Sequence, residues 1–434
     1  MRRSLPSSVA GTLAFAAVAC GGGAPAGGGA ATRDSAGITI VENDAPLWDD
    51  GSAWQVAAEP AVTIGVLDGE AEYQLFRASG AFALSDGRIV VANNGTAELR
   101  YFTSDGRFHS RAGGRGSGPG EFDWMDVARR TNGDSVMVFE LDGSVSLFDE
   151  RGAFVETIRL ELNPKSRPTL VARLAGGEYL VLRDPETSIE EFARASTERP
   201  TGVTREVLVA AVHQEDGSIG TTVAEFPGVS IETAVRDIPS KGRYPVQSRV
   251  WFAPVLGAAW FGDSFYVGTG DTYDIALHDT GGTVHRIIRR SYDARPVVEA
   301  DVAQRIELRR AASTEGGPKS SFDNANLEAE LSRMAATKTA EHFPPHGSRF
   351  LVDTEHSLWV EQFSSERWNS EQIPESGLRY DVFDRSGRYL GAVAFPPGFE
   401  PTDIGTDFVL GLWEDEFEVQ YVLKYDLFKP ASTD

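Results

Sequence analysis

The feature that most constrains this fold is a short apolar hairpin that recurs along the chain. Two clear copies are LRYFTSDGRFHSRAG at 99–113 and YDVFDRSGRYLGAV at 380–393. In each copy a glycine follows the last residue of the first strand by four positions, as Gly106 follows Phe102. Glycine readily adopts the positive φ that such a tight turn needs. Further copies lie at 145–159, 208–223 and 275–288, and a sixth first strand lies at 420–428. The repetition indicates one supersecondary unit that is used six times.

A second short hairpin precedes each copy, for example AFALSDGRIVVAN at 81–93. The others lie at 127–140, 171–183, 258–269, 350–362 and 403–413. Each unit therefore has four strands, which we name A to D from the inside outward. Four-stranded units repeated radially are typical of a β-propeller. We expect an all-β fold, a six-bladed β-propeller over about 37–430, whose last unit lacks strand D. The segment AVTIG at 61–65 is predicted to supply that strand and close the ring, so that few sheet edges stay open.

One segment between two units carries a resemblance to a known family. GRGSGPGEF at 114–122 resembles the stretch between blades in NHL-type repeats. From about residue 37 to 430, the chain is similar to bacterial six-bladed β-propeller lipoproteins with NHL-like repeats. This resemblance implies the fold rather than a chemistry. Because long insertions and a diverged sixth unit depart from plain NHL repeats, no NHL ligand is carried over to this chain.

The first residues have the pattern of an export signal. Arg2 and Arg3 precede a short apolar stretch at 13–18, as in a secretory signal peptide. Cys20 is the chain's single cysteine and follows a triplet of small residues, which resembles a bacterial lipobox with Ala17 in place of the usual leucine. We therefore expect cleavage before Cys20 and lipidation of its thiol. The alternative is ordinary cleavage that leaves an incidental free thiol.

This pattern divides the chain into three parts. Residues 1–19 are the predicted signal peptide, 20–36 a flexible Gly/Ala-rich tether, and 37–430 the propeller. No Asp follows Cys20, so the expected location is the outer membrane of a bacterium, on its periplasmic side or at the cell surface. The lipid is the only expected membrane contact, and a monomer is expected. A net charge of −23 argues against nucleic acid as a partner.

The long insertions are predicted to share one face of the propeller. In an up-and-down blade the A–B and C–D turns share one end, and the B–C and D–A connections share the other. The A–B and C–D turns are all short, whereas the long segments are all B–C or D–A connections, at 184–204, 226–254, 292–348 and 363–377. The 292–348 insertion is predicted to form two helices that act as a lid over the channel mouth; the alternative is an ordinary packed excursion that has no ligand. A binding face explains this asymmetry, and neutral drift of surface loops is the alternative.

Polar residues are expected to form a ring at the mouth of the central channel on that face. The ends of the six B strands are Asn93, Glu140, Arg183, Thr269, Gln362 and Trp413. Acidic residues follow or flank them, namely Asp142, Asp184, Asp271, Glu361, Glu414 and Asp415. Such oxygen donors suit Ca²⁺, which would resemble calcium-dependent lactonase-type propellers whose metal polarises a substrate carbonyl. The alternative is that strand ends are polar in any propeller.

Two functions remain open at this point. The first is a binding module that recognises a protein, peptide or glycan through its loop-decorated face. The second is a metal (Ca)-assisted hydrolase or lactonase with its site at the channel mouth. No HExxH, Walker, EF-hand or GxSxG motif is present, so no catalytic residue is assigned. The absence of these motifs favours the binding module, although propeller enzymes assemble sites from scattered blades.

Overall fold

A computed structural model describes most of the chain. It covers residues 29–49, 51–162, 168, 170–185, 201–238, 242–314, 331–332, 335, 340–370, 373–374 and 376–430. The predicted signal peptide, Cys20 and most of the predicted tether lie outside these residues. So do most of the 184–204 insertion and most of the second helix predicted within 292–348.

The described residues form six small sheets in chain order. The first contains β5 (Ala78–Ala83), β6 (Ile89–Asn93), β7 (Glu98–Phe102) and β8 (Phe108–Gly113). The second contains β9 (Val127–Arg130), β10 (Val136–Phe139), β11 (Ser144–Phe148) and β12 (Phe154–Arg159). The third contains β13 (Leu170–Arg173), β14 (Tyr179–Arg183), β15 (Gly202–His213), β16 (Ile219–Ile238) and β17 (Gly242–Arg249).

The remaining sheets include strands from the N-terminal part of the chain. The fourth contains β18 (Gly257–Phe261), β19 (Ser264–Gly268), β20 (Asp274–Asp279) and β21 (Val284–Arg290), followed by β2 (Ile38–Asn43) and β1 (Ala31–Ser35). The fifth contains β22 (Phe350–Val352), β23 (Leu358–Glu361), β24 (Arg379–Phe383) and β25 (Tyr389–Ala394). The sixth contains β26 (Glu400–Ile404), β27 (Phe408–Glu414) and β28 (Gln420–Phe428), with β3 (Gln55–Val56) and β4 (Val62–Ile64) both paired to β28.

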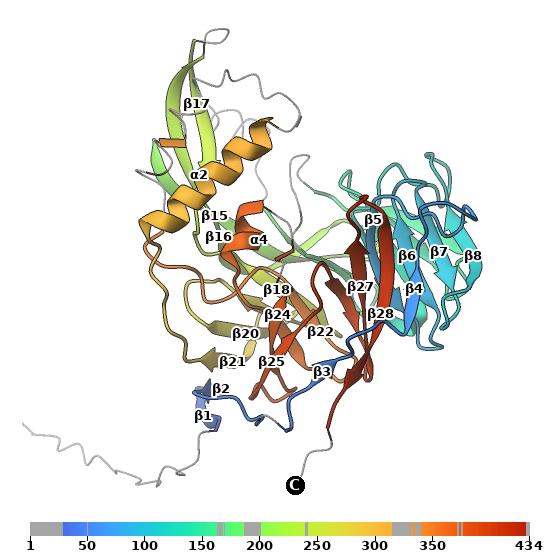
Figure 1. Ribbon diagram of the computed structural model, residues 1–434, viewed down its shortest axis with the longest axis horizontal. Helices are drawn as coiled ribbons and strands as arrows, with labels where there is room; N and C mark the ends of the chain where they lie inside the picture. Colours follow the sequence, from blue (N-terminus) through green and yellow to red (C-terminus); the bar gives the residue numbers. More distant parts are fainter. Residues whose placement is uncertain are drawn as a thin grey trace, which may run out of the picture.

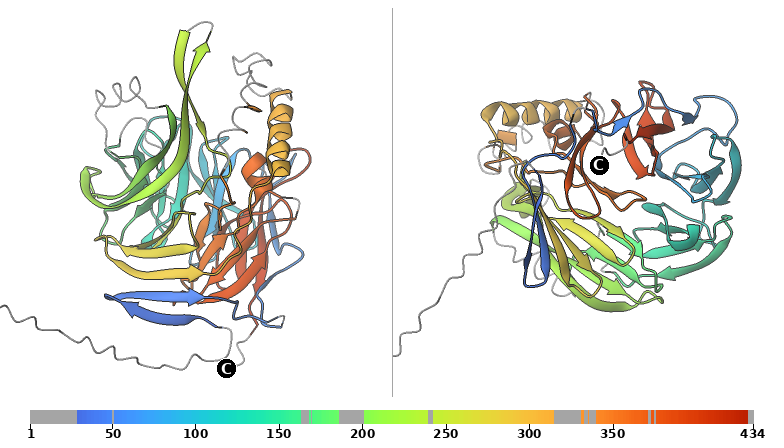
Figure 2. Two further views of the ribbon diagram at one scale, coloured as in Figure 1. Left: turned by 90° about the vertical axis from the view of Figure 1, so that its left-hand side faces the viewer. Right: turned by 90° about the horizontal axis from the view of Figure 1, so that it is seen from below.

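Apolar clusters join each sheet to the next. Val90 of the first sheet and Val138 of the second are buried in one such cluster. Equivalent clusters join the second sheet to the third, the third to the fourth, the fourth to the fifth and the fifth to the sixth. The last cluster packs Leu410 of the sixth sheet with Ile89 of the first. The fold is therefore nearly all-β and of the propeller type, with the described sheets arranged around a common axis (Figure 2, right).

The predicted outer strand of the last unit is confirmed. Strand β4 pairs antiparallel with β28, with Ile64 opposite Val422 and Val62 opposite Lys424. Ile64 is fully buried. The short strand β3 pairs with the end of β28, so the N-terminal part of the chain supplies two edge segments rather than one.

The folded part begins earlier than residue 37, where the sequence predicts its start. Strand β1 lies within the predicted 20–36 tether, and its hairpin partner β2 pairs in parallel with β21. Asn43 at the end of β2 is buried and bridges two sheets. Its amide nitrogen donates to the carbonyls of Arg289 and Gly387, and its amide oxygen accepts from the Tyr389 backbone nitrogen at 2.8 Å. The N-terminal segment therefore crosses the outer edges of the fourth and fifth sheets before it reaches the sixth (Figure 1).

Two of the long connections form regular structure that the sequence did not predict. Much of 226–254 belongs to β16 and β17, which form a three-stranded arm with β15 above the third sheet (Figure 2, left). Helix α4 (Ser365–Ser370) lies inside the 363–377 insertion. Helix α2 (Glu299–Thr314) lies inside 292–348, where the first helix was predicted. No helix among the described residues is long and apolar enough to cross a membrane.

Candidate functional site

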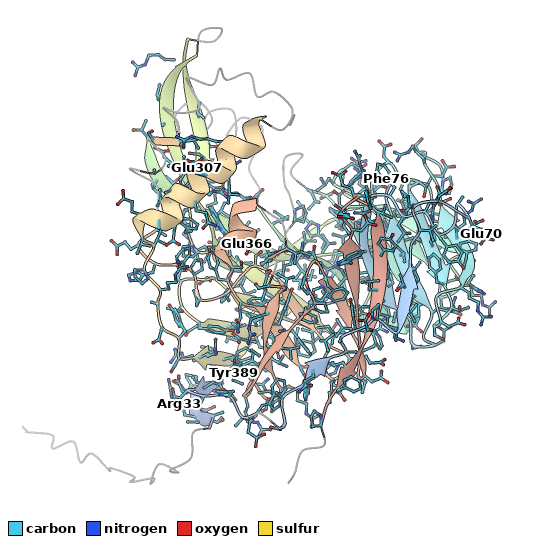
Figure 3. All side chains as sticks on the ribbon, viewed as in Figure 1. Arg33, Glu70, Phe76, Glu307, Glu366 and Tyr389 are labelled. Atoms are coloured by element: carbon cyan, nitrogen blue, oxygen red, sulfur yellow. The ribbon has the colours of Figure 1, made fainter. Side chains whose placement is uncertain are left out.

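The two ends of the sheets differ as the sequence predicts. The A–B and C–D turns are short, and their glycines, such as Gly106 and Gly387, adopt a positive φ near +85° (+83° and +89°). The opposite end carries the B–C and D–A connections together with α2, α4 and the arm, and we call it the decorated face. Figure 3 shows Glu307 of α2, Glu366 of α4 and Phe76 toward this end, whereas Tyr389 lies toward the other.

The aromatic residues on the decorated face serve mainly as packing for α2. Trp251 and Phe252 are buried in an apolar cluster that includes Val302 and Ile306 of the helix. The Arg305 guanidinium lies 4.5 Å from the Trp368 ring centroid and donates to the Trp368 carbonyl at 3.1 Å. Val302 and Ile306, which are spaced i, i+4 along the helix, therefore face this aromatic cluster.

Asn93 and Glu140, two residues of the predicted polar ring, hold neighbouring connections in place. The Asn93 side chain is fully buried, and its oxygen accepts a hydrogen bond from the Phe76 backbone nitrogen at 2.8 Å. Glu140 Oε1 accepts from the backbone nitrogens of Asp123 and Trp124 at 2.8 and 3.0 Å. Burial raises the pKa of Glu140. Both side chains therefore fasten a D–A connection to the end of a B strand.

Arg183 and Thr269 lie at strand ends on the third and fourth sheets. Arg183 is only 1% exposed, and its guanidinium donates to the Asp184 carbonyl at 2.9 Å. The Thr269 carbonyl accepts from Arg205, whose guanidinium also pairs with Asp271 at 2.6 Å. Arg205 lies on β15, so these contacts connect the base of the arm to the fourth sheet.

Gln362 and Trp413 complete the predicted ring. Trp413 packs against the Tyr421 ring, with 5.5 Å between the ring centroids. Gln362 lines a groove of about 500 Å³ on the decorated face, and the other five ring residues line neither this groove nor the central channel. The six residues lie at strand ends as predicted, but the structure does not bring them together in one pocket.

The acidic side chains around the ring do not fit a calcium site. Asp415 accepts hydrogen bonds from the backbone nitrogens of Phe417 and Val419, both at 2.9 Å. Glu361 is buried and pairs with Arg367 at 3.0 Å. Within the described ranges, no three His, Cys, Asp or Glu side chains form a cluster that could hold a metal ion. Asp415 and Glu361 are therefore held by protein partners, and the part of the chain that the structure describes brings no three such side chains together as Ca²⁺ ligands.

Asp381, a buried carboxylate beneath the groove, was not predicted from the sequence as a site residue. Asp381 is fully buried and accepts hydrogen bonds from the hydroxyls of Tyr273 and Tyr389, at 2.5 and 2.9 Å. Gln362 and Arg290 donate to the same carboxylate, each at 2.8 Å. Burial and the Asp381 charge raise the pKa of Tyr273. These contacts fix the fourth sheet to the fifth and hold Gln362 at the base of the groove.

The lining of the groove is mixed in charge and partly aromatic. It includes the arginines Arg290, Arg295 and Arg379, the acidic residues Asp293 and Glu366, and the aromatic Phe343. The Arg295 guanidinium lies 4.3 Å from the Phe343 ring centroid and pairs with Asp301 at 2.6 Å. Arg379 is exposed. The groove therefore offers an extended ligand side chains of both charges, among them the exposed Arg379.

The second cavity, of about 610 Å³, is the central channel. Residues from the A strand of all six sheets line it, among them Arg129, Arg173 and Trp260. Sequence reasoning did not select these residues, because it looked for function on the decorated face. The available signal was the group of basic residues on A strands of an otherwise acidic chain.

Comparisons with known proteins found distant structural similarity and no match by sequence. No family model and no curated protein matches the chain. Among solved structures, a protein from Bacteroides fragilis described as exported is 12% identical, with a TM-score of 0.48, and covers 90% of this chain and 100% of its own. Regucalcin, a calcium-binding protein from Agrobacterium tumefaciens, is 12% identical with a TM-score of 0.37 and covers 83% and 94%. A streptogramin B lyase is 10% identical with a TM-score of 0.37 and covers 86% and 98%.

Proposed function

We propose that the chain is an exported, lipid-anchored, six-bladed β-propeller that binds a protein, peptide or glycan through its decorated face. Six sheets joined by apolar clusters in cyclic order support the six-bladed arrangement. The observation that carries the function is the difference between the two ends of the sheets. One end consists of minimal turns, whereas the other carries the arm, α2, α4 and a groove of about 500 Å³. Long ordered connections on one end of a rigid scaffold are a common site of binding.

The arm favours a protein or peptide over a glycan. Val203 and Val207 of β15 and Val235 of β16 are exposed, at 53%, 43% and 43%. The even spacing of Val203 and Val207 places both on one face of β15. Exposed apolar side chains on a projecting element are typical of a protein-binding surface. The exposed Arg379 in the groove adds one contact for an acidic side chain of that partner.

Two substitutions on the arm test this face. The double variant Val203→Asp/Val207→Asp is expected to lose most of its partner, because two charges would be buried in the interface without compensation. The matched control is Val155→Asp, because Val155 is 57% exposed on the outer strand β12, away from the arm. The measurement is quantitative mass spectrometry of material cross-linked to the full chain in intact cells. Equal recovery from the double variant and the control would contradict binding by the arm.

The anchor is tested separately. Because Cys20 alone occupies the lipobox position, Cys20→Ser is expected to move the protein from the membrane fraction to the soluble fraction. Immunoblots of separated membranes and soluble extract measure this shift. If the variant stays in the membrane fraction at the level of the parent, the proposed lipid anchor is wrong.

A further inference from the structure

The central channel contains charged side chains that the binding of a partner at the decorated face does not use. Arg129 is the next-to-last residue of β9, and Arg173 is the last residue of β13. Both strands are followed by a short A–B turn, so these arginines lie toward the end of the channel opposite the decorated face. Both line the cavity of about 610 Å³.

Arg129 has an aromatic neighbour but no anionic one. Its guanidinium lies 4.6 Å from the ring centroid of Trp260 on β18, two sheets away around the ring. Among the described residues, no hydrogen bond or ion pair joins the Arg129 side chain to another group. Burial lowers the pKa of Arg129 to about 10, so the side chain stays charged at neutral pH. A guanidinium stacked on an indole keeps its in-plane donors free for a carboxylate.

Arg173 lies on β13 of the third sheet, between the second sheet, which carries Arg129, and the fourth, which carries Trp260. Its Nε atom is buried without a hydrogen-bond partner in the described part of the chain. The guanidinium also hydrogen-bonds to the Tyr179 hydroxyl; burial raises the pKa of Tyr179, and this bond with Arg173 lowers it in part. The described residues place no carboxylate in an ion pair with it. Buried polar groups in proteins nearly always have partners, so this Nε atom, on a residue that lines the cavity, leaves one donor for a ligand.

The other charged groups of the channel have partners of their own. Asp126, Asp353 and Asp403 each accept a hydrogen bond from a backbone nitrogen, at 2.6, 2.8 and 2.8 Å. Arg130 donates to a backbone carbonyl at 3.1 Å, and Arg349 forms an ion pair with a glutamate. Arg129 and Arg173 are therefore the lining arginines that form no ion pair with a described carboxylate.

We propose that this end of the channel binds a small organic acid, with its carboxylate held by Arg129 and Arg173 and its apolar part beside Trp260 and Phe261. Two guanidinium groups offer paired N–H donors that match a carboxylate. The Phe261 ring also lines the cavity and is stacked on Tyr266, with 5.5 Å between centroids. The volume suits a metabolite rather than a peptide or a folded partner. This site is distinct from the decorated face, so the two proposals fail independently.

Titration calorimetry of the full mature chain with citrate, succinate, benzoate and inorganic sulfate tests the site. At least one of the three acids is expected to bind more tightly than sulfate. Arg129→Gln and Arg173→Gln are each expected to weaken that binding by about tenfold or more, since each removes a charged hydrogen-bond donor. The matched control Arg151→Gln, at a turn where the Arg151 side chain is 84% exposed, is expected to leave it unchanged.

A second measurement separates a ligand site from a structural role. Without ligand, Arg129→Met is expected to keep or raise the thermal midpoint, because it removes a desolvated charge that lacks a partner and keeps the contact with Trp260. Four outcomes would overturn the proposal. They are no measurable binding of any acid, equal affinity for sulfate, binding unchanged by both glutamine substitutions, or a lower midpoint for Arg129→Met.

Discussion

A chain that begins at residue 70 is expected to unfold at a far lower temperature than one that begins at residue 37, or to fail to fold. The shorter chain lacks β3 and β4, so the outer edge of β28 is left unpaired. It also lacks Ile64, Trp48 and Trp54, which pack in the clusters that join the sixth sheet to its neighbours. Full burial of a large apolar side chain contributes about 1.5–3 kcal/mol. Ile64 is fully buried, whereas the two tryptophans are partly buried and each contribute less. Losing all three still removes a large share of the net stability of a domain, about 5–15 kcal/mol.

Calorimetry of three chains, beginning at residues 29, 37 and 70, measures this effect. The first two differ by β1, whose residues are all exposed, so their midpoints should be close. Closure by the N-terminal strands would be contradicted by equal midpoints for the chains that begin at 37 and 70.

The second large effect is expected at Asp381. Asp381→Ala leaves the Arg290 guanidinium without its carboxylate and leaves the hydroxyls of Tyr273 and Tyr389 without an acceptor. Breaking a buried charge pair by removing one partner costs about 3–5 kcal/mol. Denaturant unfolding should therefore show a marked fall in the free energy of unfolding. The fall arises because this carboxylate joins the fourth sheet to the fifth.

An aspartate on an exposed turn provides the control. Asp105 pairs with Arg107 at 2.8 Å, and both side chains are more than half exposed. Asp105→Ala is expected to leave the free energy of unfolding nearly unchanged, because an exposed ion pair contributes little to stability. If the two alanine variants were equally stable, the Asp381 contacts would not hold the sheets together as described here.

The hairpins and the closing strand were predictable because their signals are local. Alternating apolar residues and a glycine at a fixed place specify each turn without knowledge of the rest of the chain. The segment at 61–65 was identified because it parallels 109–114, which leads into the next unit in the same way. Pairing of β4 with β28 confirms that reasoning.

The N-terminal hairpin and the arm were missed because their signals are not local. Strand β1 reads ATRDS and has no apolar pattern, so its pairing depends on the backbone of β2. Within 226–254, Pro227 and Gly228 suggest a loop, but the strand passes them by a shift of register against β15. A β-bulge of this kind accommodates residues that normally end a strand.

A polar residue at the end of a strand does not reveal whether its side chain binds a ligand or holds a neighbouring backbone segment, as the predicted polar ring shows. The repeat placed Asn93 and Glu140 correctly at the ends of B strands, and both are used to accept backbone hydrogen bonds. A sequence does not distinguish a polar side chain that faces solvent from one that satisfies a neighbouring amide. Arg129 and Trp260 were missed for a related reason. These two residues are 131 positions apart in the sequence (260 − 129), and they meet only because the sheets are arranged around a common axis.

The existence of two different faces requires a closed ring, and one cross-link tests closure directly. Val62 and Lys424 lie opposite each other on β4 and β28. Directly opposed residues have Cβ atoms about 4.5–5.5 Å apart, close enough for a disulfide after a small adjustment. In a Cys20→Ser background, Val62→Cys/Lys424→Cys should therefore oxidise completely to an intramolecular disulfide, as measured by intact mass and peptide mapping. The control pair Val62→Cys/Gln214→Cys, on the sixth and third sheets, should stay reduced. Free thiols in the folded 62/424 variant would contradict the closed ring.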